Sequence, residues 1–257
     1  MTSALYVHTP VQLLPARMPW LLNRRLQPEV ACQDISLEQL DPGLMKSCAE
    51  QLAEQGLTTT IHAPFSGFNP GSPKKRLRKT AHRICQQTFQ LATILSPRCI
   101  VFHPGIPYQA SSKEQEHWLR NILQFLPDYI DQAQQMGTII TLENIYESSP
   151  ELFHRLFTEL GSQYFGHCFD IGHWNIFADR DLDTWFDQLG IFVKHLHLHD
   201  NFAKSDQHLP LGAGNINFSA LFERLKTLPV KPSMTLEAHN LPDLEISLRT
   251  FVTLFEG

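Results

Sequence analysis

Histidine, aspartate and glutamate side chains stand at the ends of the apolar runs of this chain. Nine residues share this position, at or just beyond the end of a run: His62, His103, Glu143, Asp170, His173, His197, Asp206, His208 and Glu237. Imidazole nitrogens and carboxylate oxygens are ligands of Zn²⁺, Mn²⁺ and iron in proteins. The residues therefore predict a divalent-metal site, and nine donors are enough for more than one ion.

Eight short apolar runs alternate with longer amphipathic stretches, and these are the elements that must position the donors. The runs, which we expect to be strands, cover residues 4–8, 29–33, 58–62, 99–103, 138–143, 166–170, 192–198 and 233–238. Stretches typical of helices cover 11–25, 45–55, 74–95, 113–136, 150–160, 182–189, 218–228 and 242–255. Such alternation favours a parallel sheet with helical crossovers, and eight units in about 250 residues suit a (β/α)₈ barrel. We expect a single TIM barrel domain over residues 1–257.

A parallel α/β barrel accounts for donors that come last in each run. Its strands all end at one rim, so side chains at their carboxyl ends meet at one mouth. The main rival is an open doubly wound sheet, which usually has fewer strands and a glycine-rich phosphate loop after the first. The sequence contains neither a GxGxxG nor a Walker motif, so we prefer the barrel.

The seventh run carries three alternating histidines, His195, His197 and His199. Because side chains alternate along a strand, all three share one face. His197 or His199, nearer the mouth, is expected to be the ligand, and His195 is expected to be a structural residue deeper in the barrel. His173 follows the sixth run, and we expect it in the loop beyond that strand.

Charge and cysteine content argue against several classes of protein. The net charge of −5 and the pI near 6.2 give no global basic surface for nucleic acid. The basic run 74–79 is either the solvated first turn of a helix or a patch for an anionic substrate. Five scattered cysteines without a CxxC pair suit a reducing compartment. With no recognisable signal peptide and no apolar run near the roughly 20 residues that span a bilayer, we expect a cytoplasmic protein without a membrane partner.

Seven short motifs carry a family resemblance. They are HAPF (62–65), FHPG (102–105), LEN (142–144), FDIGH (169–173), HLHDN (197–201), DQHLPLGAGNI (206–216) and LEAH (236–239). With them the chain resembles the xylose-isomerase-like TIM-barrel superfamily, which includes the endonuclease IV group and many sugar isomerases and epimerases. The resemblance is clearest from residue 61 to residue 238.

The endonuclease IV group is similar to this chain at all nine donor positions, which implies up to three ions. The likeness divides the donors into His62, His103 and a bridging Glu143 for the first ion, Glu143, Asp170, His197 and Glu237 for the second, and His173, Asp206 and His208 for the third. Zinc is the expected metal, with manganese or iron as alternatives. The implied reaction is hydrolysis of a phosphodiester by a metal-activated hydroxide.

The expected catalytic residues are Glu143 and Glu237, and the expected substrate contacts are Asn144, His199 and Asn201. A small nucleotide-loop phosphodiester of the cobamide type and abasic DNA are both candidate substrates. Long nucleic acid is not favoured, because the chain is short and acidic overall. The sequence predicts no oligomeric state.

Sugar isomerases and epimerases share only part of this pattern and supply the alternative. They resemble the chain at Glu143, Asp170, His197 and Glu237, which would hold one ion, with the two glutamates as an acid/base pair. Their loop after the seventh strand usually carries an arginine where His208 stands here. The sequence therefore ranks hydrolysis above isomerisation. A third hypothesis is a binding barrel that has lost catalysis.

Overall fold

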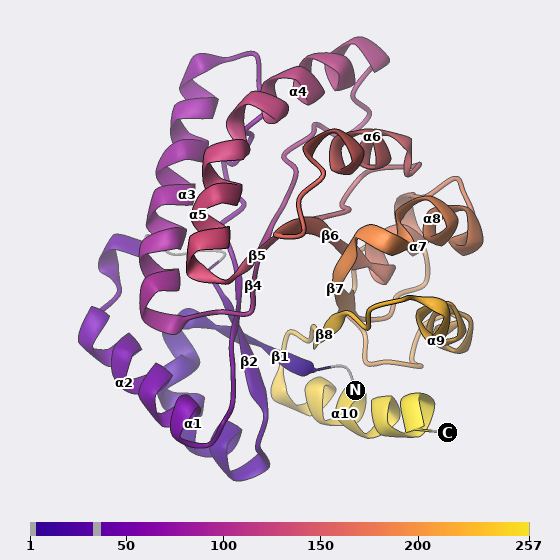
Figure 1. Cartoon of the computed structure of the whole chain (residues 1–257). Coiled ribbons are helices and arrows are strands. Elements are labelled where there is room, and N and C mark those ends of the chain that lie inside the picture. The colour runs from indigo at the N-terminus through magenta and orange to yellow at the C-terminus, as the bar shows by residue number, and fades with distance from the viewer. Residues whose placement is uncertain (1–3, 33–36, 257) are drawn as a thin grey trace.

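The predicted strands close into one barrel (Figure 1). The structure is a computed structural model that describes residues 4–32 and 37–256. The strands are β1 (Leu5–Pro10), β2 (Gln27–Ala31), β3 (Thr60–His62), β4 (Cys99–Phe102), β5 (Ile139–Glu143), β6 (Phe165–Asp170), β7 (Val193–Leu198) and β8 (Ser233–Leu236). Each pairs in parallel with the next, and β1 pairs with β8. The predicted (β/α)₈ fold is confirmed, while its extent as one domain over 1–257 stays a prediction.

Helices surround the barrel on its outside (Figure 1). They are α1 (Leu14–Arg24), α2 (Pro42–Glu54), α3 (Lys75–Leu95), α4 (Ser112–Phe125), α5 (Pro127–Met136), α6 (Glu151–Leu160), α7 (Ile171–Phe177), α8 (Leu182–Leu189), α9 (Phe218–Thr227) and α10 (Leu241–Glu256), with short 3₁₀ turns at Val11–Leu13, Leu37–Gln39 and Gly190–Phe192. Helices cover one face of each strand and the barrel interior covers the other, so both faces of a strand are buried. Accordingly, β3, β4, β6 and β8 are buried at every position.

The register of the strands brings the predicted donors to one rim. Glu143 is the last residue of β5 and Asp170 is the last residue of β6. Asp170 pairs with His197 across β6 and β7, and His62 pairs with Val101 of β4, two residues before His103. The carboxyl ends of the strands therefore collect these side chains at one mouth.

Two helical segments differ from the prediction. The expected helix 113–136 is two helices, because Pro127 has no amide proton to continue α4 and instead begins α5. The expected loop around His173 is helix α7. Asp170 caps this helix by accepting a hydrogen bond from the His173 amide at 2.7 Å. The last residue of the second expected strand, Gln33, lies outside the described residues.

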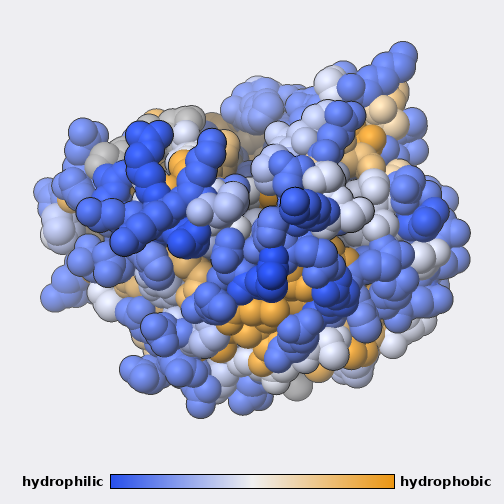
Figure 2. Space-filling model, turned by 90° about the horizontal axis from the view of Figure 1, so that it is seen from above, coloured by the Kyte–Doolittle hydropathy of each residue, from blue (hydrophilic) through white to orange (hydrophobic). Residues whose placement is uncertain are grey.

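The outer surface is largely polar. Lys74, Lys75 and Arg76 are exposed at the start of α3, which favours the solvated-helix reading of the basic run. Over residues 4–32 and 37–256, no helix combines the length and apolar character that crossing a membrane requires. One face of the molecule is dominated by hydrophilic residues, with a hydrophobic area confined between them (Figure 2).

Ser111 and Glu114 form a capping box at the start of α4. The Ser111 hydroxyl accepts from the Glu114 amide at 3.4 Å, and the Glu114 carboxylate accepts from the Ser111 amide at 2.8 Å. Ser111→Ala removes one half of this exchange and should lower the free energy of unfolding by about 1 kcal/mol. Chemical denaturation measures the loss. Ser219→Ala, at an exposed position in the first turn of α9, is the control, and an equal loss there would contradict the capping role.

Candidate metal centre

Glu143 is the point at which four of the predicted histidines meet. Its Oε2 lies 3.2 Å from His62 Nε2, 3.4 Å from His197 Nδ1 and 3.5 Å from His103 Nε2. Its Oε1 lies 3.1 Å from His173 Nδ1. One buried carboxylate thus faces imidazole rings from β3, from the loop after β4, from α7 and from β7.

The loop after β7 adds donors from the other side of the mouth. Asp206 Oδ2 lies 3.4 Å from His173 Nε2 and 3.1 Å from His208 Nε2. Glu237, just after β8, lies 3.7 Å from His208 Nδ1 and 3.5 Å from His197 Nδ1. Together with Asp170, these contacts join all nine predicted donors into one cluster.

His199 belongs to the same cluster, and the sequence offers it both as an alternative ligand to His197 and as a substrate contact. Its Nε2 lies 3.2 Å from Asp170 Oδ1, and its ring stacks on His208 with centroids 3.9 Å apart. Gly172 leaves room for this ring, since a Cβ at that position would overlap the imidazole atoms. His199 is fully buried, so it is a further candidate ligand.

Donor atoms of several trios lie within 4.8 Å of one another, which is close enough to share an ion. The trios at the mouth are His62, Glu143 and His197; Asp170, His197 and Glu237; Asp170, His173 and His199; and His199, His208 and Glu237. This grouping differs from the division implied by the sequence, since His199 takes part in two trios. The division into three ions stays a prediction.

Buried polar atoms without partners show that these residues fit a cation. In the part of the chain that the structure describes, Asp170 Oδ2, His173 Nδ1, His197 Nδ1 and both ring nitrogens of His199 have no hydrogen-bond partner. An unsatisfied buried polar group costs about 1–3 kcal/mol. A divalent ion bound among imidazoles and carboxylates would satisfy several of these atoms at once.

The electrostatics of the cluster also favour positive charge. Burial acts to raise the pKa of Glu143, but the surrounding histidines, His197 and His103 foremost, together outweigh it and hold this pKa well below its usual range. Burial acts to lower the pKa of His173, but Asp170 and Asp206 outweigh it and hold this pKa well above its usual range. Protons therefore sit where an ion would bind, and binding of an ion would release them.

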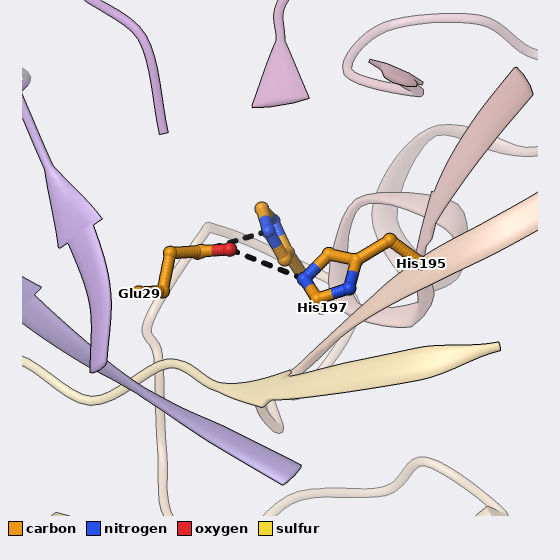
Figure 3. Close-up of side chains that lie close together, drawn as sticks. All are labelled: Glu29, His195 and His197. Carbon is orange, nitrogen blue, oxygen red and sulfur yellow. Dashed lines mark hydrogen bonds and ion pairs between the residues drawn. The ribbon is translucent and has the colours of Figure 1, made fainter. Parts of the chain in front are cut away.

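A further carboxylate, Glu29 of β2, faces His195 and His197 of β7 (Figure 3). Its Oε1 lies 3.1 Å from His197 Nε2, and its Oε2 lies 3.1 Å from His195 Nε2. Oε2 also accepts hydrogen bonds from Thr60 at 2.9 Å and Thr235 at 3.0 Å. With Nε2 of His197 directed at Glu29, its Nδ1 is left to face the mouth.

His195 is the structural histidine that the sequence predicts. It is fully buried, its Nδ1 lies 2.6 Å from the Ser233 hydroxyl, and its Nε2 faces Glu29. Glu29 is not among the nine donors that the sequence predicts. Its one signal is a charged residue at the start of an apolar run, where burial demands a partner.

The two predicted asparagines brace the loops of the mouth. The Asn144 amide donates to the Asp170 carbonyl at 2.9 Å and accepts from the Asp170 amide at 2.9 Å. The Asn201 amide donates to the Gly172 carbonyl at 3.0 Å and accepts from the Ala203 amide at 2.8 Å. Both side chains are buried. Their hydrogen bonds hold the start of α7 and the loop after β7, and the predicted contact with substrate stays a prediction.

A cavity of about 420 Å³ opens above the cluster, and we call it the central cavity. His103, His173 and Asp206 line its polar side, and Phe65 and Phe68 are among its apolar lining. The Phe65 ring stacks on the His103 ring, with centroids 4.6 Å apart. Cavities of this size suit small-molecule ligands, so a small substrate in this cavity would meet three of the predicted donors, His103, His173 and Asp206.

Comparisons with known proteins place the chain in a family. Residues 28–251 match the family model for the xylose isomerase-like TIM barrel. The uncharacterised protein MJ1311 of Methanocaldococcus jannaschii is 29% identical over 222 residues, which are 84% of this chain and 75% of that protein.

Two solved structures are similar over nearly the whole chain. The TTHB071 protein from Thermus thermophilus, soaked with ZnCl₂, is 27% identical with a TM-score of 0.80, over 98% of each chain. A D-tagatose 3-epimerase-like protein is 27% identical with a TM-score of 0.85, over 98% of this chain and 97% of that one. The resemblance noted in the sequence is thus confirmed, and the chain belongs to the xylose isomerase-like TIM barrel family.

Proposed function

We propose that the chain is a divalent-metal-dependent isomerase or epimerase of sugars or sugar phosphates. The observation that carries this proposal is the approach of two carboxylates to one buried histidine. Glu143 Oε2 and Glu237 Oε1 lie 3.4 Å and 3.5 Å from His197 Nδ1. The similarity to a D-tagatose 3-epimerase-like protein supports this reaction class over hydrolysis, which the sequence ranks first.

Proton transfer on a ketose needs two acid/base groups, and Glu143 and Glu237 are the pair proposed for it. They leave different strands, since Glu143 ends β5 and Glu237 follows β8. One carboxylate removes the proton on the carbon next to the carbonyl, and the other returns a proton to the opposite face of that carbon. The same pair moving a proton between neighbouring carbons would interconvert an aldose and a ketose.

The residues that would hold the ion are Glu143, Asp170, His197 and Glu237. A bound divalent ion would supply Lewis-acid polarisation of the substrate carbonyl and hydroxyl oxygens. The mixed imidazole and carboxylate donors suit zinc or manganese. Zinc is supported by the similarity to a protein whose structure was obtained after soaking with ZnCl₂.

Phosphodiester hydrolysis is the second candidate, and the additional donors favour it. His62, His103, Asp206 and His208 approach the cluster but lie outside the four residues that an isomerase would need. A second or third ion bound there would suit attack on a phosphate ester. A small cobamide-type phosphodiester or abasic DNA remains the substrate proposed for that case.

Glu237→Gln tests the acid/base role. Neutralising one member of the pair should slow exchange of solvent deuterium into a ketose such as D-fructose by about 10²–10⁴-fold. Mass spectrometry of the metal-loaded protein's products measures this. Glu50→Gln, on the exposed side of α2, is the matched control. Exchange that survives Glu237→Gln undiminished would rule out this carboxylate as the acid or base.

Metal affinity should depend on pH in a definite direction. The pKa values of His173 and His197 are held well above their usual range, so both rings carry protons at neutral pH. Because an ion must displace these protons, affinity should fall as the pH falls, by about tenfold per pH unit for each proton released. Calorimetric titration with Mn²⁺ at several pH values measures the slope. An affinity that does not change with pH would contradict the arrangement.

His208→Ala separates the two candidate functions. If the chain is a hydrolase with several ions, the variant should lose phosphodiesterase activity together with bound metal. If it is an isomerase or epimerase, the variant should keep one equivalent of metal and part of its deuterium exchange. Metal analysis of both proteins, with parallel assays on bis-p-nitrophenyl phosphate and D-fructose, distinguishes these outcomes.

A further inference from the structure

Tyr108, Tyr146 and Phe177 form a cluster of aromatic rings beside the metal centre. Tyr108 and Tyr146 lie in the loops after β4 and β5, and Phe177 ends α7. The rings make edge-to-face contacts, with centroid distances of 5.3 Å for Tyr108 and Tyr146, 5.9 Å for Tyr108 and Phe177, and 5.1 Å for Tyr146 and Phe177. Tyr108 is 59% exposed and Tyr146 is 44% exposed. Large aromatic surfaces that face solvent beside a catalytic mouth are typical of ligand contacts.

These rings line a second cavity, of about 610 Å³, which we call the aromatic annex. The annex and the central cavity share Ile106, Tyr146 and Phe177 as lining residues, so the two spaces adjoin. The central cavity alone already has the size of a small-molecule site. A substrate that reacts there can therefore extend into the annex.

One of the residues that line the annex, Glu147, has a carboxyl group without a complete set of partners. Glu147 Oε2 accepts a hydrogen bond from the Ile145 amide at 2.7 Å. Glu147 Oε1 is buried and has no partner within the described structure. Burial raises the pKa of Glu147 to about 7, so near neutral pH this carboxyl group can either accept or donate a hydrogen bond. A hydroxyl group is the ligand that matches both forms.

The charge of the annex argues against an anionic ligand. Among the described residues that line it, Arg155 is the one cationic side chain, and its guanidinium already pairs with both oxygens of Glu116. Glu147 and Glu151 add negative charge to the same walls. A phosphate group in this space would meet carboxylates, whereas a neutral hydroxylated ring would meet hydrogen-bonding partners.

We propose that the aromatic annex binds a second sugar ring, joined to the ketose that reacts at the metal centre. A pyranose has C–H faces that pack on aromatic rings, and hydroxyl groups at its edge that suit Glu147. The substrate is then a glycosylated ketose of disaccharide size. This inference rests on the proposed isomerase or epimerase function and narrows its substrate class.

The test compares D-fructose with isomaltulose, maltulose and leucrose, which are glucosylated fructoses that differ in linkage. Deuterium exchange is measured on the whole, Mn²⁺-loaded chain. At least one disaccharide should have a higher kcat/KM than D-fructose, by roughly threefold to tenfold if one aromatic platform contributes as usual. Tyr108→Ala should abolish this preference, and Tyr108→Phe should keep it.

Two further variants complete the design. Glu147→Ala should also lower the ratio of disaccharide to fructose kcat/KM, and it does so without removing a ring. Leu44→Ala, at an exposed apolar position on α2, should retain the wild-type ratio and controls for general destabilisation. Far-ultraviolet circular dichroism confirms that each variant is folded.

The outcomes separate the inference from the function on which it rests. Exchange with D-fructose but no preference for any disaccharide overturns the annex assignment and leaves the proposed function standing. So does a preference that survives both Tyr108→Ala and Glu147→Ala. Binding of adenosine that is lost in Tyr108→Ala would assign the annex to a nucleobase and overturn the sugar ligand. Absence of exchange in every ketose overturns the proposed function, and the annex assignment with it.

Discussion

A fully buried carboxylate, Glu29, determines how the rest of the polar interior is arranged. An ionised carboxylate in a barrel interior is stable only if its oxygens are paired. Here His195, Thr60 and Thr235 satisfy one oxygen, while the other faces His197. Burial acts to raise the pKa of Glu29, but His197 and His195 together outweigh it, hold this pKa well below its usual range and keep the group ionised. The ring of His197 is thereby fixed with one nitrogen toward the barrel and one toward the mouth.

That orientation determines what the mouth can do. Nδ1 of His197 is the common neighbour of Glu143, Asp170 and Glu237. A histidine free to rotate would not hold three carboxylates at one centre, and three carboxylates without a cation repel one another. The buried Glu29 therefore fixes the ring of His197, and the three carboxylates near its Nδ1 supply the negative charge that attracts an ion. Preorganisation of this kind is what second-layer partners of metal ligands provide.

The fold and most of the cluster could be predicted because one rule covers both. Parallel strands end at one rim, so polar residues at the ends of apolar runs had to converge, and the nine predicted donors lie together. Three features could not be predicted from the sequence, because they depend on packing between distant segments. Glu29 stands at the start of an apolar run, and the neighbouring residues give no sign of its partners on β7. Asn144 and Asn201 look like substrate contacts in a motif, yet backbone groups of neighbouring loops occupy their amides. The annex rings come from separate loops, so no spacing in the sequence links them.

The two carboxylate oxygens of Asp170 have different environments, and this affects how many of them can bind an ion. Its Oδ1 accepts the hydrogen bond that starts α7, while Oδ2 has no hydrogen-bond partner in the described structure. Oδ2 is therefore the oxygen that an ion can bind without competing with the hydrogen bond that starts α7, so we expect Asp170 to bind an ion through one oxygen. A carboxylate restricted to one bond fills one coordination position rather than two. More of the ion's coordination positions would then be available to a substrate.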